Sequence, residues 1–190
     1  MLTAVLFISR ETAERYLVSN GNTAVISITD PSQALANLPA KLHSILRIAF
    51  TDLYEESLGV PLGLIPDIHQ NPGIGLYYAE NKHKFVDARD AYSIYEFIKN
   101  LQQIQAHVEL VVHCEAGISR SAAIAKFVHE TYAVPITSCN TDTSNANLRV
   151  LRLLTKVHTG APLISGEVDA KQLQYHMDRT PKKEYAPFHW

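Results

Sequence analysis

The chain has few cysteines, no long apolar run and almost no net charge, and each shortage excludes a class of protein. Its 190 residues include two cysteines, Cys114 and Cys139, which are too few for a disulfide framework. No stretch stays apolar over the roughly 18 residues that a membrane-spanning helix needs. A formal net charge of −2 gives no strong field to attract nucleic acid or an anionic membrane. We therefore expect neither a nucleic-acid nor a membrane partner.

What remains is the composition of one folded domain. Hydrophobic residues make up 46% of the chain and charged residues 19%, a balance that argues against disorder. A chain of 190 residues can bury a core without disulfide or metal support. The nine histidines are scattered without the spacing of metal ligands, so we expect no metal, and we expect no other cofactor.

The N-terminus favours a cytoplasmic location. The apolar run at residues 1–8 is short, lacks a basic lead and soon reaches Arg10, which favours a strand over a secretion signal. A reactive thiolate also prefers a reducing compartment. We therefore expect a cytoplasmic protein, and the sequence leaves its oligomeric state open.

Strand-type and helix-type patterns alternate along the chain. Strand-type runs lie at residues 4–8, 24–28, 45–50 and 109–113. Helix-type runs lie at residues 9–18, 88–105, 119–132 and 145–159, with a further short helix expected at 33–38. This alternation predicts an α/β fold with a mostly parallel sheet of four to five strands flanked by helices. We assign the domain to residues 1–160.

Two segments do not follow this alternation. Residues 53–84 hold several prolines and glycines, and no regular element tolerates that spacing of prolines. Long irregular segments in compact domains are usually functional or mobile, so we expect this insert to flank a cleft and shape a substrate pocket; a disordered surface insert is the alternative. The polar tail at 161–190 gives no sign of whether it docks on the domain.

Apolar spacing predicts which face of each later helix is buried. In the helix at 88–105 the expected inward residues are Ala91, Ile94, Tyr95, Ile98 and Leu101. In the helix at 145–159 the expected inward residues are Leu148, Leu151, Leu154 and Val157, with Arg149, Arg152 and Lys156 on a solvated face.

The most informative stretch is residues 113–121, which reads His-Cys-Glu-Ala-Gly-Ile-Ser-Arg-Ser and joins a strand pattern to a helix pattern. A helix N-terminus leaves backbone N–H groups unpaired and partly positive, which suits a phosphate. Gly117 lets the loop turn tightly, and the planar fork of Arg120 can bind two phosphate oxygens. The same field favours the thiolate of Cys114, which is a nucleophile.

This string resembles the signature of the cysteine-dependent protein tyrosine and dual-specificity phosphatases, His-Cys-x5-Arg-Ser/Thr, and its Ser-Arg-Ser ending is most similar to the dual-specificity branch. The resemblance implies a phosphatase-like fold and a phosphocysteine intermediate, with Cys114 and Arg120 catalytic. It also implies a supporting His113, and substrate-binding roles for the residues Glu115, Ala116, Gly117, Ile118, Ser119 and Ser121, the last helping the sulfur to leave. The alternative is a buried structural cysteine beside a chance arginine.

The resemblance further implies an aspartate that acts as general acid from a loop upstream of the signature. Asp52 follows the strand at 45–50, where open α/β sheets place their ligands, and we favour it. Asp87, with Asp90 three residues on, fits better as the N-cap of a helix with its capping-box partner. Asp67, or no acid at all, stays open.

Three functions fit these residues. The first is a phosphatase acting on a phosphorylated protein or a small phosphomonoester, with the choice among phosphotyrosine, phosphoserine or phosphothreonine and non-protein substrates left open. The second is a catalytically weak phosphate-binding pseudophosphatase, and the third is a rhodanese-type sulfurtransferase. The loop lacks extra lysines, which argues against highly anionic inositol phosphates. Cys139 lies in a polar stretch, where we expect it to be incidental; a resolving thiol for oxidised Cys114 is the alternative.

Overall fold

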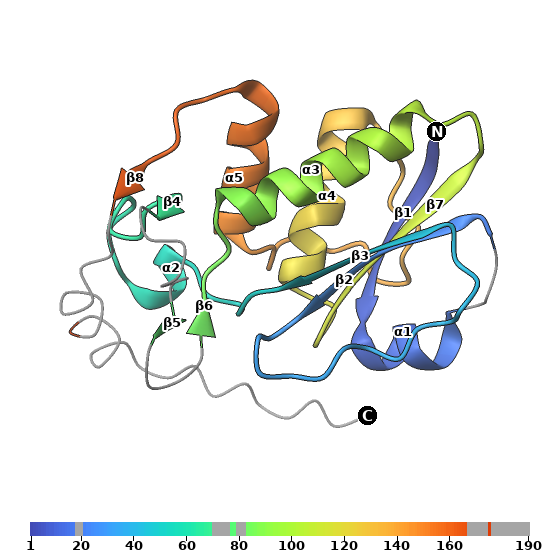
Figure 1. Cartoon of the computed structure of the whole chain (residues 1–190), viewed down its shortest axis with the longest axis horizontal. Coiled ribbons are helices and arrows are strands. Elements are labelled where there is room, and N and C mark those ends of the chain that lie inside the picture. Colours follow the sequence, from blue (N-terminus) through green and yellow to red (C-terminus); the bar gives the residue numbers. More distant parts are fainter. Residues whose placement is uncertain (18–20, 70–76, 79–82, 167–174, 176–190) are drawn as a thin grey trace.

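The computed structural model describes residues 1–17, 21–69, 77–78, 83–166 and 175 (Figure 1). Its elements in chain order are β1 (Leu2–Ser9), α1 (Arg10–Tyr16), β2 (Thr23–Thr29), β3 (Ser44–Ala49), α2 (Glu55–Leu58), β4 (Ile68–His69), β5 (Tyr77–Tyr78), β6 (His83–Lys84), α3 (Ala88–Gln103), β7 (Val108–Cys114), α4 (Arg120–Tyr132), α5 (Leu148–Thr159) and β8 (Ser165–Gly166). Much of the irregular insert and of the tail lies outside the described residues. The parts concerned are 70–76 and 79–82 of the insert at 53–84, and 167–174 and 176–190 of the tail at 161–190.

The core of the molecule is a four-stranded sheet in the order β1-β7-β2-β3. All three strand pairings are parallel, so every strand ends at the same edge of the sheet. β2 is buried along its whole length, as is typical of a parallel strand covered on both faces. Helix α5 packs against both α3 and α4 beside the sheet (Figure 1). The prediction of a single α/β domain with a parallel sheet is therefore confirmed.

Helix α3 follows the sequence prediction closely. Its side chains Ala91, Ile94, Ile98 and Leu101 are buried in the core, and Tyr95 packs against it half-buried. The helix begins with the predicted capping box. Asp87 Oδ1 accepts from the N–H groups of Arg89 and Asp90 at 2.9 and 3.1 Å. Asp90 Oδ2 in turn accepts from the N–H of Asp87 at 3.1 Å. The two carboxylates thus satisfy three backbone N–H groups at the start of the helix.

The short helix expected at 33–38 is wrong. The described segment forms no helix there, because side chains of neighbouring elements take its backbone groups. Arg10 Nη2 donates to Leu35 O at 3.3 Å, and Arg47 Nη1 donates to Ala36 O at 3.0 Å. Each carbonyl held in this way has a partner outside the segment, which removes the need for a helical turn.

The inward face assigned to α5 is right for Leu154 and Val157, which are buried, and wrong at the start of the helix. Arg149, expected in solvent, is 0% exposed, whereas Leu148, expected inward, is 44% exposed. Asn147 caps the helix, its Oδ1 accepting from the N–H of Val150 at 3.0 Å. The buried stripe consists of Arg149, Val150, Leu153, Leu154 and Val157. The spacing of leucines did not predict this stripe correctly, because one of its members is an arginine whose charge is paired.

Arg149 is buried because every arm of its guanidinium has a partner. Nη1 donates to Glu55 Oε1 at 2.6 Å and to Ile65 O at 3.1 Å. Nη2 donates to Pro66 O at 2.9 Å, and Nε donates to Val86 O at 2.9 Å. Burial lowers the pKa of Arg149, and the neighbouring carboxylate of Glu55 opposes that shift. The charge is thus held by an ion pair and three carbonyls.

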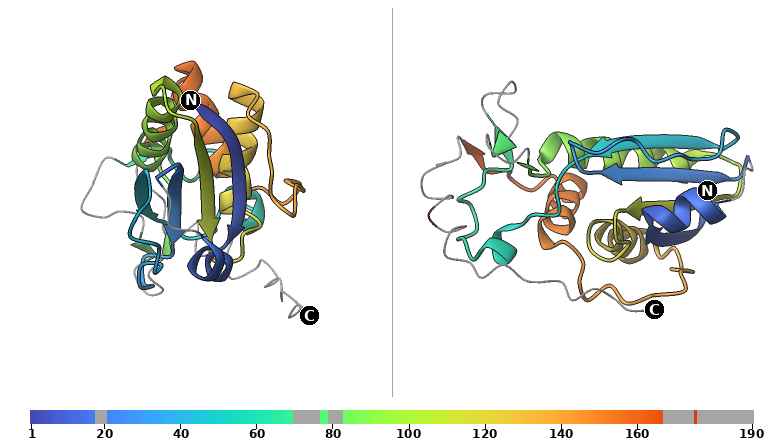
Figure 2. Two further views of the ribbon diagram at one scale, coloured as in Figure 1. Left: turned by 90° about the vertical axis from the view of Figure 1, so that its right-hand side faces the viewer. Right: turned by 90° about the horizontal axis from the view of Figure 1, so that it is seen from below.

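These contacts fix residues 53–69 of the insert to α5. A small second core of Leu58, Val60, Ile65 and Phe85 forms beneath them. The base of the insert is closed where Thr51 N–H donates to Lys84 O at 2.7 Å. The elements α2, β4, β6 and β8 lie together beyond one end of the sheet (Figures 1 and 2), and β4 pairs with β8. The described part of the insert is therefore packed against the domain.

We expect Arg149→Met to lower the free energy of unfolding by about 3–5 kcal/mol, because it breaks a buried ion pair with Glu55, which keeps only Arg152, and leaves three carbonyls without their donor. Denaturant unfolding measures the change. The matched control is Lys99→Met, which removes an exposed pair with Glu96 and should cost about 0.5 kcal/mol or less. Equal stability of the two variants would contradict the buried-anchor interpretation.

Candidate active site

The residues of the signature lie at the edge where the parallel strands end. β7 ends at Cys114 and α4 begins at Arg120, so residues 115–119 form the loop between them. β1 ends at Ser9 on one side of β7, and β2 is followed by Asp30 on the other. Ligands in open α/β sheets bind at this edge.

The loop is seated directly on the backbone that joins β1 to α1. Gly117 adopts a φ of 70°, and a Cβ there would lie 2.3 Å from Ser9 N and 2.4 Å from the carbonyl carbon of Ile8. Arg10 N–H donates to Glu115 O at 3.2 Å. Within the described chain, no group accepts a hydrogen bond from the N–H groups of residues 115–119. Backbone donors left unpaired in this way can form a cradle for an anion.

Cys114 and Ser121 face each other across the base of the loop. The two residues are 1% and 0% exposed, and Cys114 Sγ lies 3.2 Å from Ser121 Oγ. Because Ser121 lies in the first turn of α4, its hydroxyl and the start of the helix both act on the same sulfur. This geometry lets the hydroxyl donate to a sulfur anion.

The guanidinium of Arg120 is held at one end and unpaired at the other. Nη1 donates to Phe50 O at 2.8 Å, and Nη2 donates to Asp30 Oδ2 at 3.2 Å. Nε is buried and has no hydrogen-bond partner among the described residues. A buried donor without an acceptor is costly, so the unpaired Nε indicates a place for a ligand oxygen.

Of the candidate acids, Asp52 contacts the loop. Its Oδ1 accepts from Ser119 Oγ and from Asn147 Nδ2, each at 2.8 Å. Asp87 instead caps α3. Asp67 is 1% exposed and binds Lys156 Nζ at 2.6 Å in the cluster around Arg149. Neither alternative acid is near the loop by these contacts.

His113 is a buried residue of β7, directly before Cys114. Its ring is 0% exposed, and Nε2 lies 2.8 Å from Ser27 Oγ on β2. Burial lowers the pKa of His113 to about 4, and the positive charges of Arg10 and Arg47 add to the shift. The imidazole is thus neutral at physiological pH and ties β7 to β2.

Two residues of the site were missed from the sequence. Asp30 directly follows β2 at the ligand-binding edge, so its position after a buried strand was an available signal. Asn147 begins α5, where an asparagine is a common N-cap, but nothing local indicates that its amide reaches Asp52, 95 residues away.

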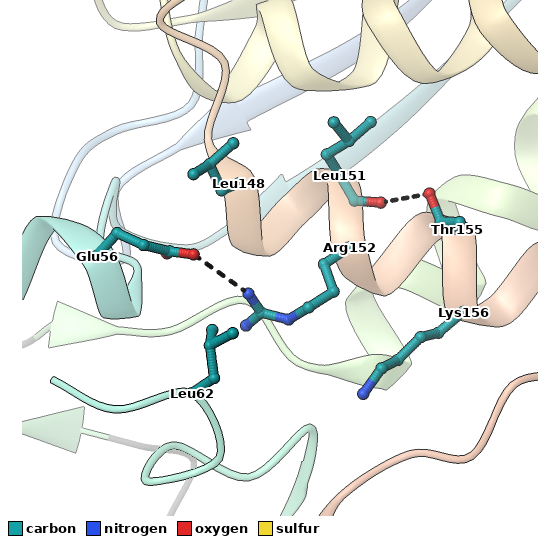
Figure 3. Close-up of a pocket in the computed structure, with 7 residues that line it drawn as sticks. All are labelled: Glu56, Leu62, Leu148, Leu151, Arg152, Thr155 and Lys156. Atoms are coloured by element: carbon teal, nitrogen blue, oxygen red, sulfur yellow. Dashed lines mark hydrogen bonds and ion pairs between the residues drawn. The ribbon is translucent and has the colours of Figure 1, made fainter.

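A separate pocket of about 420 Å³ lies between α5 and the segment after α2 (Figure 3). It is lined by Glu56, Leu62, Leu148, Leu151, Arg152, Thr155 and Lys156, with none of residues 113–121. Leu62 and Leu148 are 64% and 44% exposed. The insert thus lines a pocket, and its role in substrate choice stays a prediction.

The second cysteine, metal binding and membrane spans are further features on which the sequence supports expectations. Cys139 is free and exposed. In the described residues no cluster of three or more histidine, cysteine or acidic side chains is arranged to hold a metal ion. None of the described helices is both long enough and apolar enough to cross a bilayer.

Comparisons with known proteins find similarity among solved structures. No family model matches the chain, and a search of curated proteins finds no similar sequence. Among solved structures, the chain is similar to the crystal structure of human tyrosine phosphatase-like serine/threonine/tyrosine-interacting protein. That similarity covers 81% of this chain and 91% of the other, with 19% sequence identity and a TM-score of 0.45.

We expect Gly117→Ala to abolish binding of inorganic vanadate to the loop, because the new Cβ would collide with the backbone of Ile8 and Ser9. Calorimetry with vanadate measures the loss. Gly21→Ala is the control, since a Cβ there meets nothing within 4 Å. Unchanged vanadate affinity in Gly117→Ala would show that the loop does not form the cradle.

We expect His113 to make folding sensitive to acid. The unfolded chain protonates this ring below pH 6.5, whereas the folded protein keeps it neutral down to about 4. The contribution of His113 to the free energy of unfolding is therefore fully present above pH 6.5. It falls by on the order of 3 kcal/mol as the pH drops to 4. Denaturant unfolding of the wild type and of His113→Asn across this range measures the difference. The same slope in both proteins would contradict the assignment.

Proposed function

We propose that the protein is a cysteine-dependent phosphatase that hydrolyses phosphomonoesters through a phosphocysteine intermediate. The observation that carries the proposal is the unpaired, buried Nε of Arg120 beside a loop of unpaired N–H groups, with the sulfur of Cys114 at its base. Preorganised donors of this kind stabilise the charge that develops on transferred phosphoryl oxygens.

In the first step, the loop and Arg120 bind the three non-bridging oxygens of the phosphoryl group. The sulfur anion of Cys114 attacks phosphorus, an S–P bond forms, and the bond from phosphorus to the leaving oxygen breaks. Asp52 gives its proton to that oxygen, which departs as an alcohol or phenol. The contact from Ser119 to Asp52 supports this role, because it ties the acid to the loop that binds the phosphoryl group.

In the second step, water attacks phosphorus and the S–P bond breaks. The carboxylate of Asp52 takes the proton of the water, and the sulfur leaves as an anion. Ser121 donates a hydrogen bond to the leaving sulfur, a role that its 3.2 Å separation from Cys114 Sγ supports. The products are inorganic phosphate and the regenerated enzyme.

The substrate belongs to the phosphomonoesters of proteins or small molecules. The loop places Glu115 at its exposed rim, where the carboxylate lies 3.9 Å from Arg10 Nη1. A rim that carries a carboxylate disfavours substrates with many phosphates, because like charges repel. Phosphoserine and phosphothreonine stay open for a substrate panel.

We expect wild-type protein to hydrolyse p-nitrophenyl phosphate and Cys114→Ser to lose that activity entirely. Asp52→Asn should lower kcat by about 100-fold or more for phenyl phosphate, because general acids contribute roughly 10²–10⁴-fold, and should remove the basic limb of its pH–rate profile. Asp87→Asn is the control, since this aspartate only caps α3.

Each alternative function has its own outcome in the same assays. Binding of phosphate without turnover of any phosphosubstrate would overturn the enzyme proposal in favour of a phosphate-binding module. Transfer of sulfur from thiosulfate, lost in Cys114→Ser, would identify a sulfurtransferase. Turnover that survives in Cys114→Ser would exclude the sulfur as nucleophile.

A further inference from the structure

The two oxygens of the Asp52 carboxylate have different surroundings. Oδ1 accepts both hydrogen bonds, from Ser119 Oγ and from Asn147 Nδ2, each at 2.8 Å. No described residue donates to Oδ2. An oxygen that already accepts two donors is a poor place for a proton, so the proton of the acid form resides on Oδ2.

Asn147 cannot turn its amide around. The residue is 0% exposed, and its Oδ1 accepts from the N–H of Val150 at 3.0 Å as the N-cap of α5. Because that position requires an acceptor, the NH₂ group must face Asp52. The backbone N–H of Asn147 also donates to Ser119 O at 3.2 Å. One buried residue thus contacts the helix start, the loop and the acid.

The segment that follows Asp52 is anchored to the same helix. Arg149, two residues beyond Asn147, holds Glu55 at 2.6 Å, three residues beyond Asp52. The segment is therefore bound to the start of α5 at two points, at Asp52 itself and three residues later at Glu55. A loop held at both points has little freedom to carry the carboxylate away from the signature.

We propose that Asn147 is a positioning residue for the general acid. By occupying Oδ1 together with Ser119, its amide makes Oδ2 the oxygen that gives the proton in the first step and takes it in the second. This inference rests on the proposed function, because it assigns a role to Asn147 only through Asp52.

The variant that tests it is Asn147→Asp. An aspartate has the same shape and caps a helix as well as asparagine does, so α5 keeps its first hydrogen bond. It cannot donate to Asp52 when ionised, and it places a second carboxyl beside the first. Two neighbouring carboxyls share a proton, which holds the acid form to higher pH.

We expect Asn147→Asp to bind phosphate as the wild type does, and to show a kcat for phenyl phosphate lowered about tenfold or more, a fraction of the full general-acid contribution. For 2,4-dinitrophenyl phosphate, whose leaving group needs no proton, kcat/KM, which reports the first step alone, should change by less than about twofold, whereas kcat/KM for phenyl phosphate should fall with its kcat. The basic limb of the profile for phenyl phosphate should move to higher pH. Asn145→Asp, at an exposed position two residues upstream, makes the same change of charge and should alter none of these values.

A double variant separates action through Asp52 from a general loss of structure. If Asn147 acts through the acid, Asn147→Asp should lower kcat no further once Asp52→Asn is present. Asn147→Ser keeps a capping hydroxyl but has no amide, so it should lower kcat for phenyl phosphate in the same selective way if the aspartate variant does not fold.

The failure of this inference can be told apart from the failure of the proposed function. A wild type without turnover, or an active Cys114→Ser, overturns the phosphatase proposal itself. An active wild type with the expected Asp52→Asn behaviour, but equal losses in Asn147→Asp for both leaving groups, overturns the role of Asn147. A loss additive with that of Asp52→Asn does the same.

Discussion

The close approach of Gly117 to the backbone at the end of β1 is the contact on which the candidate site depends. With its Cα beside Ser9 N and the carbonyl carbon of Ile8, the loop has no room for a side chain and turns through a positive φ. This seating leaves the N–H groups of the loop without acceptors in the described chain, above the sulfur of Cys114. The parallel order of the strands makes the contact available, because β1 and β7 are neighbours that end at the same edge.

Two buried arginines show how the same side chain serves structure in one place and chemistry in another. Arg149 and Arg120 are 0% and 4% exposed, and each has a carboxylate partner. Every nitrogen of Arg149 donates to an atom of the protein, which accounts for its buried charge. Arg120 keeps an unpaired Nε. The completeness of the hydrogen bonds, rather than burial or charge, separates the anchor from the proposed anion binder.

The sequence was most informative where a local pattern decides the structure. The change from strand to helix pattern around Cys114 and the capping box at Asp87 depend on neighbours in the chain, and both could be predicted. The buried face of α5 could not be predicted in full, because Arg149 is buried through its ion pair with Glu55, 94 residues away. The spacing of leucines gives no information about that partner. The role of Asn147 could not be predicted for the same reason, because it depends on a contact with Asp52, 95 residues away. Asp30 was missed although it directly follows a buried strand, because its contact with Arg120 depends on the strand order.

The start of α5 joins the stability of the domain to the proposed chemistry. Asn147 holds the carboxylate of Asp52, and Arg149 holds the segment just beyond it, so both contacts sit on one rigid turn of helix. The loop proposed to bind phosphate is seated mainly on β1, between β7 and the start of α4. At its last residue it also meets α5, because Asn147 N–H donates to Ser119 O at 3.2 Å. In the proposed mechanism, a change at the start of α5 would therefore act directly on the acid and would reach the loop only through Ser119.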